Sequence, residues 1–241
     1  MPGATIADLL TLVTRNPGRP RLTWYGADGE RVELSGAVLE NWVNKTTNLL
    51  VEEFDAAPGT RVALDLPPHW RTLVWAMATW RCGACVVLDG DEHDVLATHR
   101  PAPETRGDVV AVALAALARR FDGPLPGGAV DAASAVMTYG DVVGWAPPVD
   151  RAAPALDVAG MQVPHDALVA PAAVGARTLV DAGAADVATF LRHALGVLAA
   201  DGSLVVLDAA TAGRLRADPE ALGRLVTSER VEVDTGVAPR A

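Results

Sequence analysis

The stretch that decides the fold is residues 61–88, which read RVALDLPPHWRTLVWAMATWRCGACVVL. It opens with an apolar run that two prolines end, a pattern typical of a buried strand. Apolar side chains then recur at helical spacing over residues 70–82. After Gly83 a second apolar run, residues 85–88, indicates another buried strand. The stretch therefore predicts a strand, a helix and a second strand, the unit from which parallel sheets are built.

The same alternation of helix and strand continues on both sides of this stretch. Residues 35–54 predict a long helix, with Ser35 as its N-cap and one apolar stripe along its length. Residues 121–160 are rich in Pro, Gly, Ala and Asp and predict irregular structure with one short helix near 129–137. Further strands are expected at residues 109–114, 178–180, 204–207 and 231–233, and further helices at residues 184–200 and from Asp218 onward. The expected fold class is α/β, with mostly parallel sheets flanked by helices.

Length, composition and charge narrow the classes of protein. The 241 residues are 50% hydrophobic, enough for a single compact α/β unit over residues 1–241, which could divide into sub-lobes at 1–145 and 146–241. The net charge is −10 and the arginines are scattered, so neither nucleic acid nor an anionic membrane is expected as a partner. We find no apolar run long enough to span a membrane and no basic flank at the N-terminus, and we expect a cytoplasmic protein.

Two cysteines, Cys82 and Cys85, could form a redox pair or half of a metal site. His93 and His99 follow them, as in a zinc-binding arrangement. However, Cys85 opens a predicted buried strand, and the gap to His93 is shorter than the usual zinc-finger spacing. We therefore expect two small buried residues, with no metal and no cofactor.

Several segments, in the same order along the chain, resemble the AMP-binding domain of adenylate-forming enzymes. Residues 22–25 with 33–35 resemble its opening strand pair, residues 57–64 its PGDRVAL segment, residues 80–89 its KAGAVVVPLD segment, residues 160–169 its GVMLSHRNLV segment, and residues 198–207 with 218–231 its later portion. The similarity spans residues 20–234, and the chain also resembles an actinobacterial family of unknown activity that is distantly similar to these enzymes. The resemblance implies the fold of their N-terminal subdomains, without the C-terminal lobe.

The same resemblance shows which catalytic parts are not found. In that family a Ser/Thr/Gly-rich loop ending in Pro-Lys-Gly holds the phosphates of ATP and directly precedes the segment that residues 160–169 resemble. Here residues 153–159 read APALDVA, without a Lys and with the negative charge of Asp157. The family's YGxTE segment, its ribose-binding segment and its C-terminal catalytic lysine are not found either. Lys45, the only lysine, lies in the middle of a predicted helix. We expect no adenylation and assign no catalytic residue.

Candidate pocket residues follow from the position of ligands in open α/β sheets, which bind beyond the carboxyl ends of strands. The residues that meet this rule are His69, Trp70, Asp89, Asp91, Glu92, His93, Asp181 and Asp208. Such side chains could bind a divalent cation or act as acid and base, and the alternative is ordinary polar loops and helix caps. Trp24 and Trp145 could also line a pocket, whereas His165 is expected to begin a helix.

Three functions remain open at this stage. The first is a noncatalytic descendant of the adenylate-forming fold that binds a small acyl or nucleotide-like ligand, or a protein partner. The second is an enzyme of another class, with a metal or acid–base site at the strand ends. The third is a scaffold or partner subunit whose pocket is empty.

Overall fold

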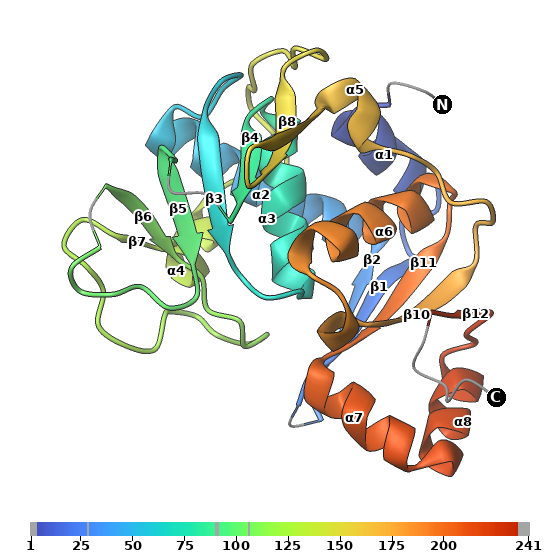
Figure 1. The fold of residues 1–241 in the computed structure, drawn as a ribbon. Coiled ribbons are helices and arrows are strands. Elements are labelled where there is room, and N and C mark those ends of the chain that lie inside the picture. The colour runs from blue at the N-terminus through green and yellow to red at the C-terminus, as the bar shows by residue number, and fades with distance from the viewer. Residues whose placement is uncertain (1–3, 28, 90–91, 106, 236–241) are drawn as a thin grey trace.

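Two sheets with helices between and around them make up the computed structural model, which describes residues 4–27, 29–89, 92–105 and 107–235 (Figure 1). The five-stranded sheet has the order β12 (Val233–Asp234), β10 (Arg177–Asp181), β11 (Ser203–Leu207), β1 (Pro20–Tyr25) and β2 (Arg31–Ser35). The seven-stranded sheet has the order β7 (Val130–Asp131), β6 (Asp108–Ala111), β5 (Val95–Thr98), β3 (Arg61–Asp65), β4 (Cys85–Leu88), β8 (Pro154–Val158) and β9 (Met161–Pro164). All neighbouring strands are parallel except the pairs β1–β2 and β8–β9, which confirms the expected fold class.

Most of the helices begin at a residue whose side chain caps them. They are α1 (Ile6–Val13), α2 (Gly36–Phe54), α3 (Trp70–Arg81), α4 (Ala132–Ala135), α5 (His165–Leu168), α6 (Val187–Ala199), α7 (Ala209–Ala217) and α8 (Pro219–Ser228), with 3₁₀ turns η1 (Val136–Thr138) and η2 (Ala182–Ala184). The Ser35 side chain accepts the N–H of Val38 at the start of α2, as expected. His165 is the first residue of α5, and its Nε2 lies 3.1 Å from the carbonyl oxygen of Gly83.

The core surrounds α3, which lies between the sheets. Every residue from Trp70 to Trp80 is buried, so this helix has no solvent-facing side. Two of its threonines donate to nearby carbonyls, Thr72 to that of Pro67 just before the helix and Thr79 to that of Trp75 within it. The sequence predicted a single apolar face, and the additional burial follows because α3 packs against α1, α2 and α6 as well as against β3 and β4.

The five-stranded sheet is covered on both faces, as its central strand β11 shows. Leu204 and Val206 join the main core, while Val205 and Leu207 pack into a second apolar cluster with α7 and α8. Because successive side chains of a strand point to opposite faces, residues 204–207 of β11 are all apolar. Figure 1 shows α7 and α8 on the side of this sheet that is turned away from β3 and β4.

The strands of the two sheets do not separate at residue 145. The five-stranded sheet combines β1 and β2 with β10, β11 and β12 from the other end of the chain, while β8 and β9 belong to the seven-stranded sheet. How the chain divides into units, including the sub-lobes 1–145 and 146–241, stays a prediction.

Some predicted elements were wrong. Residues 121–160 were expected to be irregular apart from one short helix near 129–137, and α4 with η1 confirms that helix. The same stretch also contains the strands β7 and β8, and the buried Asp157 interrupts the apolar pattern of β8. The strand expected at 109–114 ends at Ala111, and the strand expected at 231–233 is Val233–Asp234. Helices α1 and α7 and strands β5 and β9 were not predicted. These elements are short, so their periodicity is weak and tertiary packing decides their structure.

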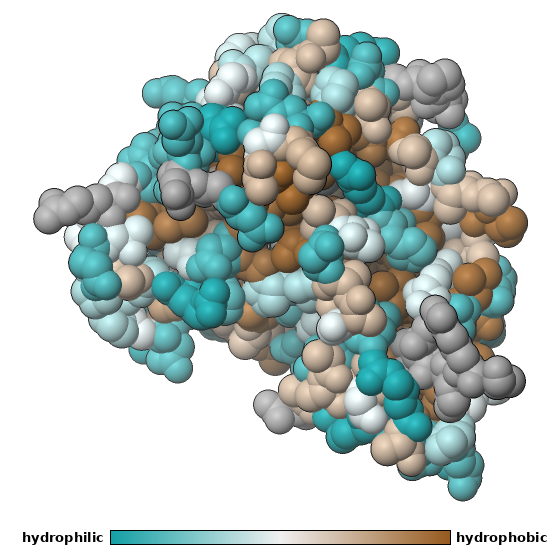
Figure 2. Space-filling model, in the orientation of Figure 1, coloured by the Kyte–Doolittle hydropathy of each residue, from teal (hydrophilic) through white to brown (hydrophobic). Residues whose placement is uncertain are grey.

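The surface has a mixed character. Figure 2 shows apolar side chains reaching the surface in the middle of this face, between the two sheets, among hydrophilic side chains. Within the part of the chain that the structure describes, no helix has both the length and the apolar character needed to cross a membrane.

Candidate functional site

A cavity of about 510 Å³, which we call the strand-end cavity, opens where strands of both sheets end. Its walls come from the end of β1, the turn between β1 and β2, and the segments that follow β3, β6, β10 and β11. Apolar walls are provided by Trp24, Pro67, Leu114 and Ala115, among others. This is the place where open α/β sheets bind ligands, and the volume lies within the range of small-molecule pockets, roughly 300–1,000 Å³.

His69 is the buried polar side chain of this cavity. It is the N-cap of α3 and only 5% exposed, and its Nδ1 accepts the N–H of Arg71 at 3.1 Å. The ring stands edge-on to Trp24, with 4.3 Å between ring centroids. Burial, aided by the Arg71 charge, lowers the pKa of His69 to about 3, so the imidazole is neutral. Because Nδ1 is an acceptor, the proton of this neutral ring is on Nε2.

Glu30 connects two walls of the cavity. One carboxylate oxygen accepts the indole N–H of Trp24 at 3.2 Å, and the other accepts the backbone N–H of Ala116 at 2.8 Å. Trp24 lies on β1 and Glu30 precedes β2, whereas Ala116 belongs to the segment after β6. The carboxylate therefore fixes the five-stranded sheet to a loop of the seven-stranded sheet.

Arg71, on α3, binds the same loop after β6. It is buried, and its guanidinium donates to the carbonyl oxygens of Leu114, Ala115 and Ala116 at 3.4, 3.0 and 3.3 Å. Its Cζ lies 4.3 Å from the ring centroid of Trp70. Burial lowers the pKa of Arg71 to about 10, and the charge is kept at neutral pH.

Asp208 and Asp181 occupy the ends of β11 and β10. Asp208 is half-buried in the cavity wall and caps α7, since its Oδ1 accepts the N–H of Thr211 at 2.7 Å. Asp181 lies beneath the wall: it accepts the N–H of Gly183 at 2.8 Å and forms an ion pair with Arg216. A Cβ on Gly183 would approach the Cβ of Ala209 to 2.5 Å, so a glycine is required where η2 meets α7.

The structure thus brings together only some of the predicted pocket residues. His69, Asp208 and Trp24 line the strand-end cavity, and Asp181 supports it. Asp89 lines a second cavity, of about 600 Å³, beyond the ends of β3, β4 and β8.

The other candidates lie elsewhere. Trp70 is buried in the core against Trp42, with 5.6 Å between ring centroids. Glu92, His93 and Trp145 are exposed and line neither cavity. Asp91 lies outside the described residues.

Metal and thiol chemistry find little support in the geometry. Among the residues that the structure describes, no three His, Cys, Asp or Glu side chains gather as a metal site would require. Cys82 and Cys85 are buried and free, and burial raises the pKa of each thiol to about 11.

A tight hairpin stands where the resemblance places the phosphate loop. β8 ends at Val158 and β9 begins at Met161, so only Ala159 and Gly160 join them. Both have positive φ, 49° and 86°, as in a type I′ turn.

Asp157 fastens this turn. Its Oδ1 accepts the N–H of Gly160 at 2.8 Å, and its Oδ2 accepts from Gln162 at 3.1 Å and from both Nη atoms of Arg61 at 3.2 Å. The hydrogen bond from Gln162 has the largest effect, and together these bonds lower the pKa of Asp157 although burial alone would raise it. The carboxylate and the turn N–H are therefore engaged with each other.

Lys45 has a structural role. Its Nζ donates to the carbonyl oxygen of Tyr139 at 2.6 Å and pairs with Asp141 at 2.9 Å. It fixes the segment after η1 to α2 and lines neither of the two cavities.

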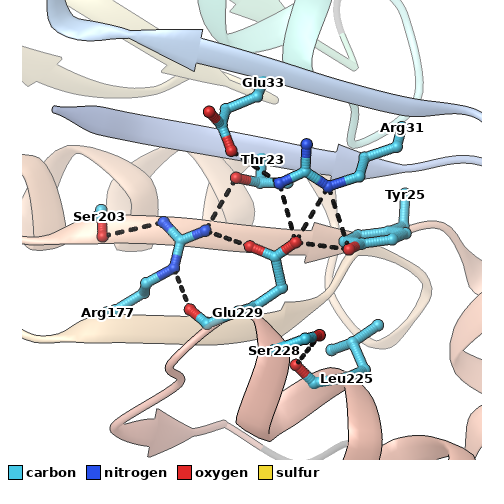
Figure 3. Close-up of polar contacts among 9 residues, drawn as sticks. All are labelled: Thr23, Tyr25, Arg31, Glu33, Arg177, Ser203, Leu225, Ser228 and Glu229. Atoms are coloured by element: carbon cyan, nitrogen blue, oxygen red, sulfur yellow. Dashed lines mark hydrogen bonds and ion pairs between the residues drawn. The ribbon is translucent and has the colours of Figure 1, made fainter. Parts of the chain in front are cut away.

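A buried carboxylate outside both cavities is also fully engaged (Figure 3). Glu229, 7% exposed, follows α8 and accepts hydrogen bonds from Tyr25 at 2.5 Å, from Arg31 at 3.0 Å and from Arg177 at 2.5 Å. Arg177 also donates to Ser203 and Thr23. This cluster joins α8 to β1, β2, β10 and β11 and is a structural clamp.

Sequence reasoning missed Glu30, Arg71 and Gly183. Glu30 had a usable signal, because it follows the carboxyl end of β1. The strand-end rule covers this position but was not applied there. Arg71 and Gly183 carried none, since their roles depend on the loop after β6 and on α7, which are distant in sequence.

Solved structures show which fold this is. The chain aligns with a Brucella canis acyl-CoA synthetase with a TM-score of 0.65 and 19% identity, over 91% of this chain and 49% of that one. It aligns with a Mycobacterium tuberculosis fatty acyl CoA synthetase with a TM-score of 0.62 and 13% identity, over 95% of this chain and 48% of that one. With an amide bond synthetase from Marinactinospora thermotolerans the TM-score is 0.58 and the identity 16%, over 95% of this chain and 48% of that one. The fold is that of adenylate-forming enzyme domains, and the chain spans about half the length of these proteins.

Sequence comparison gives a much nearer relative. No family model matches the chain. A TIGR03089 family protein of Mycobacterium tuberculosis is 34% identical over 238 residues, which cover 91% of this chain and 93% of that protein. Such identity over nearly the whole of both proteins shows common membership. This chain belongs to the TIGR03089 family.

Proposed function

We propose that this protein is a non-adenylating member of the adenylate-forming fold that binds a small acyl-type ligand in the strand-end cavity without turnover. The hairpin turn at Ala159-Gly160 is the observation that carries this proposal. A phosphate-binding loop needs several free backbone N–H groups around one anion, and usually a cation. The two-residue turn is too short for such a loop, and its Gly160 N–H is already bonded to Asp157.

The charge around the turn supports the same conclusion. Arg61, the cation nearest to Asp157, is paired with it, so it is not free to bind phosphate. Lys45, on α2, is engaged with Asp141 and with the backbone carbonyl of Tyr139. A triphosphate would therefore meet a carboxylate and no free lysine.

The cavity supports the binding part of the proposal. Its walls are mainly apolar, and His69, Asp208 and Glu30 add a few polar groups at set positions. A pocket of this composition suits a compact apolar molecule with one polar end. The Glu30 and Arg71 contacts hold the Leu114–Ala116 wall in place, which reduces the ordering cost of binding.

Two measurements test the proposal. ATP–pyrophosphate exchange with a panel of carboxylic acids should give no signal above the blank, and exchange that depends on both ATP and an acid would overturn it. Short-chain acyl amides and esters, titrated against Trp fluorescence or thermal shift, should bind saturably.

A matched pair of variants locates the binding. Ala115→Phe places a ring in the cavity wall and should abolish binding. Leu117→Phe, at a 93% exposed position outside the lining, should leave binding unchanged. Equal binding by both variants would contradict the assignment of the ligand to this cavity.

A further inference from the structure

We propose that the strand-end cavity selects an uncharged ligand, a carboxamide in its simplest form, whose carbonyl oxygen accepts from His69 and whose N–H donates to Asp208. This inference rests on the proposed function and adds the chemical class of the ligand. Free carboxylates and phosphates are expected to bind more weakly than amides of the same shape.

The donor is the Nε2–H of His69. This side chain is 5% exposed, and its Nδ1 is occupied by the N–H of Arg71. Nε2 has no hydrogen-bond partner among the described residues and is not fully enclosed, and His69 lines the strand-end cavity. This donor is free to bond to whatever occupies the cavity, and a ligand carbonyl oxygen can accept from it in place of water.

The acceptor is the free oxygen of Asp208. Oδ1 of this carboxylate caps α7, and Oδ2 has no partner among the described residues. Both oxygens of Glu30, on another wall, already accept N–H groups. Asp208 is therefore the carboxylate with capacity left for a ligand N–H.

The charges around the cavity disfavour an anion. None of its described lining residues is Arg or Lys, whereas two are carboxylates. The nearby guanidinium groups point elsewhere: Arg71 donates to the carbonyls of residues 114–116, and Arg214 to the carbonyl of Ala27 and to Thr211. A ligand carboxylate would lie beside Asp208 in a partly desolvated site, where like charges repel strongly.

A ring-matched set of probes tests the inference. Benzamide, benzoate and phenyl phosphate share one ring and differ in the charge of the polar end. Isothermal titration at pH 7 should give a Kd for benzamide at least about tenfold lower than for either anion, a difference well within the range of one buried hydrogen bond and one repelled charge. Benzoate binding as tightly as benzamide would overturn the inference and leave the proposed function standing.

One isosteric variant isolates the acceptor. Asp208→Asn removes the charge and keeps a good N-cap for α7. It should strengthen benzoate binding and reduce the ratio of the two Kd values toward one. Asp218→Asn, the same change at the N-cap of α8 and outside the cavity lining, should leave the ratio unaltered.

The remaining outcomes also decide. An unchanged ratio in Asp208→Asn would exclude Asp208 as the selecting group and overturn the inference. Thermal unfolding of each variant shows whether it is folded. If none of the three probes binds to the wild-type protein, while short acyl esters do, the amide class is wrong. If no acyl compound of any charge binds, the proposed function itself fails.

Discussion

Arg71 and Glu30 hold the same three-residue segment, 114–116, through opposite backbone groups. Arg71 donates to its carbonyl oxygens, and Glu30 accepts the N–H of Ala116. A loop is usually the most mobile part of a binding site. Here a buried cation and a half-buried carboxylate fix it, so the wall of the strand-end cavity is formed before any ligand arrives.

Replacement of Arg71 should release this wall. Arg71→Met keeps much of the side-chain volume but leaves three carbonyl oxygens without their donor. We expect a loss of about 2–4 kcal/mol in the free energy of unfolding and faster amide hydrogen exchange in residues 113–117. Arg81→Met, on the same helix and without a side-chain hydrogen bond among the described residues, should leave exchange in that segment unchanged. Unaltered exchange in Arg71→Met would show that other contacts hold the loop.

Replacement of Glu229, the buried carboxylate of the clamp, should destabilise the protein. Glu229→Gln removes the countercharge of Arg31 and Arg177 in a buried site, and breaking such a pair costs about 3 kcal/mol. Urea unfolding measures this loss. Glu220→Gln, whose carboxylate is 87% exposed and pairs with Arg224, should change stability by less than about 0.5 kcal/mol. Equal effects of the two substitutions would contradict a structural role for the clamp.

Acid should destabilise the protein through the same residue. Burial alone would raise the pKa of Glu229, but hydrogen bonds from Tyr25, Arg177 and Arg31 outweigh it and lower the pKa below the usual 4.5. The unfolded state therefore binds this proton at a higher pH than the folded state does. The stability that Glu229 contributes is fully present above its pKa in the unfolded state and is lost as pH falls through its pKa in the folded state.

Urea unfolding between pH 7 and pH 3 measures this dependence. Glu229→Gln should show a shallower decline below pH about 4.5 than the wild-type protein. Asp157, whose pKa is also lowered, keeps part of the decline in both proteins. Parallel pH profiles for the two would exclude Glu229 as a source of the acid sensitivity.

The two thiols should be inert in the folded protein. Cys82 and Cys85 are buried, and burial raises the pKa of each to about 11. A chromogenic disulfide reagent at pH 8 should therefore label neither in the native protein and both after denaturation. Rapid labelling of Cys82 under native conditions would contradict the packing at the end of α3, and rapid labelling of Cys85 the packing of β4.

The sequence predicted the unit β3–α3–β4 because its signals are local. Proline and glycine separate apolar runs whose periods differ, and no distant partner is needed to recognise them. β8 could not be predicted in the same way. Asp157 makes the strand look polar, and its burial depends on Arg61, which lies far away in sequence but close in the sheet.

The candidate site was predicted in part for a related reason. The strand-end rule identified His69 and Asp208, since it depends only on where strands stop. It says nothing of the direction of a side chain, so Trp70, next to His69, was also named although it points into the core. The contacts of Arg71 and Glu30 join segments that the chain brings together only when folded.

The parallel pairing of β1 with β11, Leu22 opposite Leu204, has a consequence for biosynthesis. One edge of β1 stays unpaired on the ribosome until β11 has emerged, and open strand edges of nascent chains are prone to aggregation. The strand-end cavity needs Asp208, which leaves the ribosome later still. A product terminated before β11 therefore lacks the Asp208 wall of this cavity.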